Sequence, residues 1–335
     1  MDIYNSKAHP IIKNQDTYFL DKKIVVFHSE DRDICKWPNS NEFEVSLPES
    51  LHNIQSMRLI SIKLDDTLPV FSNNYRNTKL SFSLASNPDN ILTIDIDEGT
   101  YTPELLASTI ENLMNLKAIG NDFICSYNKV SKKILFGAKT DFFLNFDKYH
   151  NYKTICYNDY NFRNNNNNWG LPYLLGYERK KYSSTKAAND IKLNYDSTNI
   201  IISTNNYYIN TENILPIKIN GENSIYMEVD KYNIIDELLP DASCNKKSQL
   251  SVNNGKVNSA FAQIPLKESV YEQIYECKNN YNPPIKDISK LKFKFRFHDG
   301  RLVDFKNINF SFMIEFNSLT NEQRRNTFIR SGSML

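Results

Sequence analysis

The residue types that most often bind metals or carry out redox chemistry are scattered along this 335-residue chain. Its five histidines show no H-x-H or H-E-x-x-H spacing, and no two of its five cysteines form a C-x-x-C pair. Zinc and thiol redox sites need such spacings because their ligands must converge. We therefore predict no metal-binding residue. The side chains concerned are His9, His28, His52, His150, His298, Cys35, Cys125, Cys156, Cys244 and Cys277.

Acidic residues gather in two places where a general acid, a general base or a calcium ligand could lie. Asp95, Asp97 and Glu98 follow one strand-like run, and Asp65 and Asp66 follow another. The first group does not fit an EF-hand, because a helix is expected to begin directly after it. Solvated strand ends explain both groups more simply, and a glycosidase would need two carboxylates facing each other across a sugar.

Motifs for nucleotide binding and acyl transfer are missing from the sequence. There is no G-x-S-x-G, no P-loop and no G-x-G-x-x-G, so hydrolase, nucleotide and dinucleotide sites lack their usual physical apparatus. We predict no catalytic residue, no cofactor-binding residue, no cofactor and no small-molecule substrate. The chain is not expected to be an enzyme.

The tripeptide His298-Asp299-Gly300 could be taken for catalytic chemistry, but neighbouring residues in a tight turn seldom point at one another. Asp-Gly is a strong turn signal, so Asp299 and Gly300 are predicted to form a structural turn. Two alternating aromatic arms flank it, Leu291–Phe297 and Phe310–Phe316. A hairpin with a two-residue loop would set Phe295 opposite Asp304 and Phe293 opposite Lys306, which puts aromatic and charged side chains on the same face. We therefore expect a bulge or a short strand at Leu302–Phe305.

The composition is that of a globular, β-leaning protein, with 20 Tyr, 20 Phe and 13% aromatic residues. Its net charge of +1 does not favour nucleic acid as the main partner, since polyanion-binding surfaces usually bring a basic excess. The first 16 residues lack the apolar core of a signal peptide, and no apolar run approaches the ~20 residues of a membrane span. We expect a soluble intracellular protein with reduced thiols.

Hydrophobic periodicity predicts many short strands and one helix. The helix is expected at Pro103–Leu116, with Thr102 as N-cap, and a hairpin should follow, with a turn at Asn128–Ser131. The predicted fold class is mainly β, an antiparallel jelly-roll β-sandwich with an inserted small α+β subdomain. The expected division is an N-terminal arm with a short strand (1–41), a jelly-roll body (42–319) and a C-terminal tail (320–335). Within the body we expect the inserted subdomain at about 79–146 and a long loop at about 148–169.

Four segments, in this order, resemble parts of the minor capsid and virion structural proteins of large nucleocytoplasmic DNA viruses, a giant-virus jelly-roll family. Each resembles a recurrent feature of that family: an opening strand pair, a glycine-x-tyrosine segment before a helix, a leucine-glycine-aromatic island, and a closing hairpin with an Asp-Gly turn. They are FEVSLPESLHNIQSMRLISIKLDDTLP (43–69), IDEGTYTPELLASTIENL (96–113), GLPYLLGY (170–177) and ISKLKFKFRFHDGRLVDFKNINFSFMIEF (288–316).

The resemblance implies a structural component of an icosahedral capsid, a minor capsid or vertex protein that joins or cements major capsid subunits. It implies the major capsid protein, other capsid subunits and further copies of this chain as partners, and the virion as its location, after assembly in the host cytoplasm. The segments 148–169 and 244–256 have no counterpart in the family, so vertex and facet positions stay open.

Two other functions compete with the capsid role. A carbohydrate-binding or carbohydrate-cleaving sandwich would stack Trp37, Trp169 and tyrosines on sugar rings, and a nucleic-acid accessory protein would use the basic tail. Both chain ends, 1–21 and 321–335, lack the periodicity needed to pack into a sandwich but carry isolated apolar anchors. The residues predicted to contact a partner are Arg324, Arg325, Phe328, Ile329 and Arg330.

Overall fold

The computed structural model describes residues 18–64, 68–147, 170–193, 196–238, 257–266, 278–306 and 308–321. The predicted loop at 148–169 and the predicted partner contacts from Arg324 to Arg330 lie outside these described residues. The chain divides into two compact units. Unit 1 comprises residues 1–65, 224–237 and 258–335, and unit 2 comprises residues 66–223 and 238–257.

Unit 1 is built on one six-stranded antiparallel sheet in the order β1-β18-β2-β17-β13-β16. A short 3-10 helix, η2 (Ser29–Asp31), follows β1, and β14 (Ile235–Leu238) and β15 (Val257–Ala260) form a separate pair. The sheet strands are β1 (Tyr18–His28), β2 (Glu42–Lys63), β13 (Ser224–Val229), β16 (Ala262–Pro265), β17 (Asn279–Arg296) and β18 (Ser311–Asn321).

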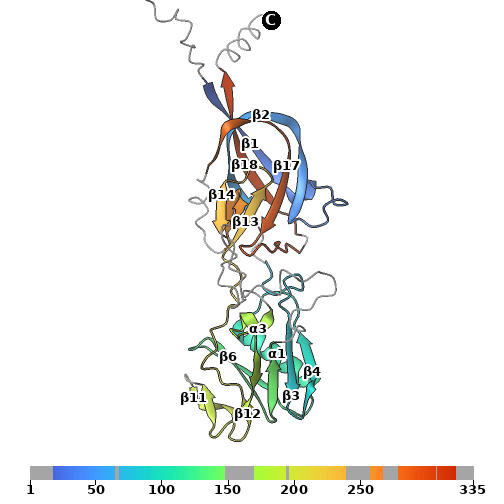
Figure 1. Ribbon diagram of the computed structural model, residues 1–335, viewed down its shortest axis with the longest axis vertical. Helices are drawn as coiled ribbons and strands as arrows, with labels where there is room; N and C mark the ends of the chain where they lie inside the picture. Colours follow the sequence, from blue (N-terminus) through green and yellow to red (C-terminus); the bar gives the residue numbers. More distant parts are fainter. Residues whose placement is uncertain are drawn as a thin grey trace, which may run out of the picture. The chain divides into compact units, whose positions relative to one another are not determined.

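The sheet of unit 1 folds over on itself to make a sandwich. Phe293 of β17 lies opposite Phe43, near the start of β2, and Phe312 of β18 lies opposite Ile62, near its end. A straight strand would separate Phe43 and Ile62 by roughly 60 Å, yet the rings of Phe293 and Phe312 are 4.8 Å apart. The strand β2 must therefore bend back, and Figure 1 shows β2 and β17 arching together.

Bulges make this bend. The pairing of β17 with β2 shifts register between Asn280 and Ile285 and again between Ile288 and Lys290, and Asn53 of β2 has a positive φ of 53°. Bulges let a strand turn a corner and pass from one layer to the other. The predicted fold class, a mainly β antiparallel sandwich of the jelly-roll kind, is confirmed.

The alternating aromatic rows face the inside of this sandwich. Phe293 and Phe295 are fully buried, and Phe312 is 1% exposed. Ring contacts join the layers, with centroids of Phe27 and Phe293 5.0 Å apart and those of Phe295 and Phe310 5.0 Å apart. Burying four aromatic side chains of this size contributes roughly 6–12 kcal/mol before the entropic cost. This core holds the two layers together.

The expected closing hairpin does not form. Strands β17 and β18 each pair with β2 and not with each other, because the chain crosses to the other layer after its turn. That turn lies at Asp299 and Gly300, where the Gly300 N–H donates to the Phe297 carbonyl at 3.1 Å and Gly300 has φ 86°. A short return follows, in which the Val303 N–H donates to the Phe295 carbonyl at 3.1 Å.

Unit 2 contains two four-stranded sheets, β4-β3-β7-β8 and β5-β6-β12-β9, and a two-stranded pair, β10-β11. Their bounds are β3 (Lys79–Leu84), β4 (Asn87–Asp95), β5 (Ile124–Asn128), β6 (Lys133–Ala138), β7 (Phe142–Asn145), β8 (Lys181–Ser183), β9 (Thr185–Lys186), β10 (Ile191–Leu193), β11 (Asp196–Ile202) and β12 (Tyr207–Tyr208). The described residues of the unit also form two helices, α1 (Pro103–Lys117) and α3 (Leu171–Leu174).

The predicted helix is confirmed as α1. The Thr102 side chain accepts a hydrogen bond from the Leu105 backbone N–H at 3.2 Å, which satisfies one of the free donors of the first turn. Leu106, Ile110 and Met114 recur at helical spacing, and all three are fully buried in the core of unit 2. The predicted hairpin is also confirmed, as β5 and β6.

Unit 2 is larger than the insertion expected at 79–146. Strand β8 pairs with β7, and β12 pairs with β6, so the chain from Leu171 to Asn223 returns to this unit. The segment 199–223, expected in the sandwich, therefore belongs to unit 2. At the other end, β1 is a full eleven-residue member of the sheet and not a short strand in an arm.

Candidate interaction surfaces

The acidic residues singled out after β4 hold loops in place. The Glu98 carboxylate accepts a hydrogen bond from the Asn73 backbone N–H at 2.7 Å. The Asp95 carboxylate lies 3.5 Å from the Lys79 ammonium nitrogen, and the Asp97 backbone carbonyl accepts from a tyrosine hydroxyl. These contacts agree with the interpretation of the acids as a strand end.

The histidines are not brought together. His52 pairs with Asp287 at 3.0 Å on an exposed part of β2 and β17, and His298 contacts Glu237. Within the described residues no group of three or more His, Cys, Asp or Glu side chains could hold a metal ion. Seven candidates lie outside those residues: His9, Asp65, Asp66, His150, Cys156, Cys244 and Cys277.

Cys125 of β5 is not placed to act as a nucleophile. The side chain is 5% exposed, and burial, with the nearby Glu111 carboxylate, raises the pKa of its thiol well above the ordinary value. A thiol with a raised pKa carries little thiolate at neutral pH. The Glu111 carboxylate instead accepts the Cys125 backbone N–H at 2.8 Å, which fastens α1 to β5.

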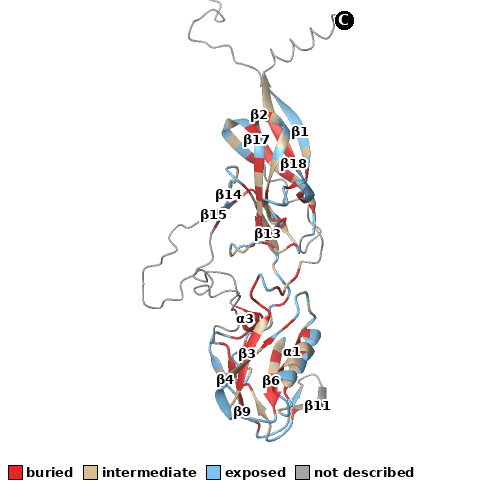
Figure 2. Ribbon diagram, turned by 90° about the vertical axis from the view of Figure 1, so that its right-hand side faces the viewer, coloured by how far each residue is buried: buried red, intermediate tan, exposed pale blue. Residues whose placement is uncertain are grey.

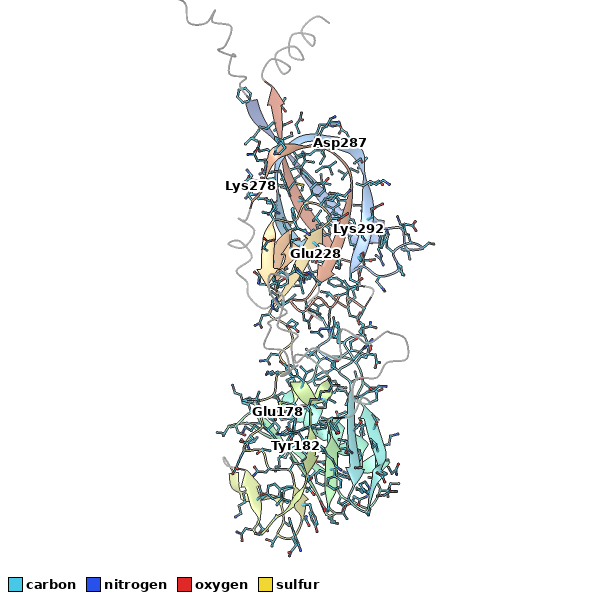
Figure 3. All side chains as sticks on the ribbon, viewed as in Figure 1. Glu178, Tyr182, Glu228, Lys278, Asp287 and Lys292 are labelled. Carbon is cyan, nitrogen blue, oxygen red and sulfur yellow. The ribbon has the colours of Figure 1, made fainter. Side chains whose placement is uncertain are left out.

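The outward basic row of β17 forms a charge ladder with acids on the flanking strands. Lys290 lies 3.9 Å from Glu44, Lys292 2.6 Å from Glu42, Lys294 3.3 Å from Glu228, and Arg296 2.7 Å from Glu237. Figure 3 labels Glu228 and Lys292 in this ladder. Because each cation has its own carboxylate, the row presents little net positive charge to a polyanion.

The charge ladder becomes more buried along the strand, from Lys290, 62% exposed, to Arg296, 1% exposed. At the buried end the Arg296 guanidinium also contacts Glu228 and lies 5.1 Å over the Tyr226 ring. Burial, and then the neighbouring Glu237 carboxylate, raise the pKa of the Tyr226 hydroxyl. The cluster thus ties β13, β14 and β17 together by charge-assisted hydrogen bonds.

Trp37 does not offer a bare stacking face. The Lys292 ammonium nitrogen lies 4.8 Å from its ring centroid, and that of Lys36 lies 5.4 Å away. These cations occupy the region above the ring that a sugar would need. Trp169, the other tryptophan of the chain, lies outside the described residues.

A second ion network locks the other layer of unit 1. The Glu315 carboxylate of β18 is 4% exposed and lies 2.6 Å from Lys22 of β1 and 2.9 Å from Arg58 of β2. The Asn317 side-chain amide donates to it at 2.9 Å. Burial alone would raise the pKa of Glu315, but the hydrogen bonds from Lys22, Asn317 and Arg58 outweigh it and lower the pKa to about 2.

The strand β1 is an exposed edge of the sheet. It pairs with β18 on one side, and none of the described strands pairs with its other side. Its outward aliphatic side chains are open to solvent, with Leu20 56%, Ile24 50% and Val26 45% exposed, and Met313 of β18 beside them is 38% exposed. Figure 2 colours β1 largely as exposed. This is the largest exposed aliphatic group on the described part of the sheet.

The sequence alone predicts only part of the charge ladder on β17 and does not identify the exposed edge of β1. The basic row was recognised on β17, but its acidic partners come from β2, β13 and β14, which only the fold brings near. The exposed edge does leave a sign in the sequence. Ile24, Val25, Val26 and Phe27 are four apolar residues in a row, and successive residues of a strand point to opposite faces. If the core covers only one face, two of these side chains must point away from it.

No protein-family model and no curated protein matches this chain. Among solved structures it is similar to the penton protein of mavirus, at 11% identity and a TM-score of 0.35, with 90% of this chain and 99% of that chain covered. It is also similar to a chain of the Sputnik virophage structure, at 12% identity and a TM-score of 0.31, with 91% and 98% covered.

No helix among the described residues is both long and apolar enough to cross a membrane.

Proposed function

We propose that this chain is a structural, non-enzymatic component of an icosahedral viral capsid, a minor capsid or vertex protein that joins or cements major capsid subunits. The observation that carries the proposal is where the family-like segments lie. The first gives β2 and the last gives the end of β17, its turn and β18, so they supply three neighbouring strands of the sandwich. The other two segments precede or form α1 and α3 of unit 2.

The chemistry of the surface supports this proposal over its competitors. The charge ladder argues against a nucleic-acid site on β17, and the cations above Trp37 argue against sugar stacking there. What unit 1 does offer is an exposed strand edge whose first residue, Tyr18, pairs with Asn321, the last residue of β18. Exposed edges and arms are features through which protein subunits join.

In this proposal the partners are the major capsid protein and other capsid subunits, and the chain is located in the virion after assembly in the host cytoplasm. Arg324, Arg325 and Arg330 of the tail would pair with acidic rims of a neighbour, at exposed sites worth about 1 kcal/mol or less each. Phe328 and Ile329 would add apolar anchors. An arm that orders on its neighbour makes a large contact at modest affinity, so misplaced copies dissociate.

The test is to quantify the chain by mass spectrometry in purified particles, relative to their main shell protein. The proposal expects a fixed ratio across gradient fractions that contain intact particles. Absence from the particle, or a ratio that varies from fraction to fraction, would overturn it.

The tail is tested by deleting residues 322–335, with a Gly/Ser tail of equal length as the matched control. Both variants should keep the melting temperature of the full chain, because β18 ends at Asn321. Both should also be incorporated less well into particles. Normal incorporation of either variant would show that the tail sequence is not a partner contact.

A further inference from the structure

The edge strand β1 has the properties of a strand that accepts another strand. Its eleven residues pair with β18 in one register from Tyr18–Asn321 to His28–Ser311, without a bulge. The backbone N–H and C=O groups on its other side alternate with those used by β18 and form a regular row. A row of this length can template a further antiparallel strand.

This edge lacks most of the protections that sheet edges usually have. Edges are commonly blunted by proline, by bulges or by charged side chains, lysine above all. Strand β1 has no proline, and its two lysines are engaged, Lys22 with Glu315 at 2.6 Å and Lys23 with Glu49 at 3.0 Å. The opposite edge of the sheet, β16, is only four residues long and ends at Pro265.

We propose that β1 pairs with β1 of a second copy of this chain, antiparallel, about a two-fold axis that passes beside Lys22. Residues directly opposite in an antiparallel pair lie on the same face of the sheet, so a symmetric pairing must be centred on a residue. Centring on Lys22 places Asp21 opposite the second copy's Lys23, and does so twice. It also places Leu20 opposite Ile24 twice.

Charge complementarity selects this register over its neighbours. A centre on Asp21 would set two aspartates opposite each other, and a centre on Lys23 would set two lysines opposite each other with Asp21 facing Val25. A centre on Ile24 would leave Asp21 opposite Phe27. The Lys22 centre also sets two lysines opposite each other, and each of these keeps its Glu315 carboxylate at 2.6 Å. What separates the registers is that only the Lys22 centre makes opposite-charge pairs, Asp21 with Lys23, on both sides of the axis.

The pairing would also cover the exposed aliphatic group. Leu20, Ile24 and Val26 of each copy lie on the same face as Met313, so two copies bring their groups together across the new strand pair. The inference concerns the isolated protein and does not depend on the proposed capsid role. If the protein dimerises in solution but is absent from particles, the dimer stands and the capsid role fails. If it is present in particles but monomeric in solution, the capsid role stands and the dimer fails.

The first test is sedimentation velocity over a concentration series with the full chain. We expect a reversible monomer–dimer equilibrium that Asp21→Lys weakens about tenfold or more, because two attractive pairs become two repulsive ones. The double variant Asp21→Lys/Lys23→Asp should recover dimerisation, since the pairs are exchanged and not removed. A monomer at every concentration, or a dimer indifferent to Asp21→Lys, would overturn the proposal.

The second test fixes the register by disulfide trapping. The test variant is Lys22→Cys and the control variant is Ile24→Cys. Both are made in a background in which every native cysteine except the buried Cys125 is replaced by serine. Under mild oxidation Lys22→Cys should give a covalent dimer, because the position lies on the symmetry axis, and Ile24→Cys should not. Stronger trapping at position 24 would overturn the register. The replaced cysteines are Cys35, Cys156, Cys244 and Cys277.

Discussion

Replacing Glu315 with glutamine removes one buried charge from the β1–β18–β2 layer and keeps nearly the same shape. The carboxyl pKa is lowered from 4.5 to about 2 in the folded chain. One pKa unit corresponds to about 1.36 kcal/mol, so the shift contributes about 3 kcal/mol to the free energy of unfolding at neutral pH. Because the folded pKa is the lower one, this stability is fully present above pH 4.5 and is lost as pH falls toward 2.

We therefore expect Glu315→Gln to destabilise unit 1 by up to about 3 kcal/mol at pH 7 and by much less near pH 2. The difference between wild type and variant should shrink mainly between pH 4.5 and pH 2. Urea denaturation measures this, since urea does not screen charge. The Trp169→Phe background leaves Trp37 as the only tryptophan and makes its fluorescence report on unit 1.

The matched control is Glu49→Gln. Glu49 also pairs with a lysine of β1, at 3.0 Å, but its side chain is 79% exposed, so its loss should leave the unfolding free energy almost unchanged. Equal effects of Glu315→Gln and Glu49→Gln at pH 7 would contradict a stabilising role of the Glu315 charge. So would a Glu315→Gln variant that keeps the full pH dependence of wild type between pH 5 and pH 2.

Substitutions at four further positions test the packing described above by urea denaturation or thermal unfolding. Arg296→Met should cost up to about 3 kcal/mol because it takes the guanidinium away from the buried Glu237 carboxylate, which then keeps its contact with His298, while Lys290→Met at the exposed end of the same ladder should cost less than about 1 kcal/mol; equal effects would contradict the burial gradient. Phe293→Ala should cost about 3–5 kcal/mol, and a loss below 1 kcal/mol would mean that the two layers do not depend on this ring. Thr102→Ala should lower the stability of unit 2 by about 1 kcal/mol through the lost N-cap, and Thr102→Ser should restore most of it.

Local patterns predicted the elements whose residues interact nearby in sequence. The helix α1 follows from its 3.6-residue period and from Thr102 and Pro103 at its start, and the buried face of β17 follows from strict alternation. These patterns depend only on chain geometry and on which side meets a core. They say nothing about which strand lies alongside.

Non-local pairing could not be predicted in this way. The hairpin expected between β17 and β18 does not form because both strands pair with β2. That pairing depends on packing throughout the core and not on the local Asp299-Gly300 turn. The return of the chain to unit 2 depends on β8, β9 and β12, which are two or three residues long and too short to show a period. The partners of Arg296, namely Glu228 and Glu237, lie 68 and 59 positions away in sequence.

The pairing of β1 with β18 also sets an order of events during synthesis. Asp21 and Ser318 are joined by a hydrogen bond although 297 positions separate them, whereas the last described residue in the buried core of unit 2 is Ile219. At roughly 5–20 residues per second on the ribosome, about 5–20 s pass between the emergence of Ile219 and that of β18. Unit 2 can fold in that interval, but β1 and β2 wait without their common neighbour, with their apolar faces uncovered. The nascent sandwich is therefore the part of this chain most in need of a chaperone.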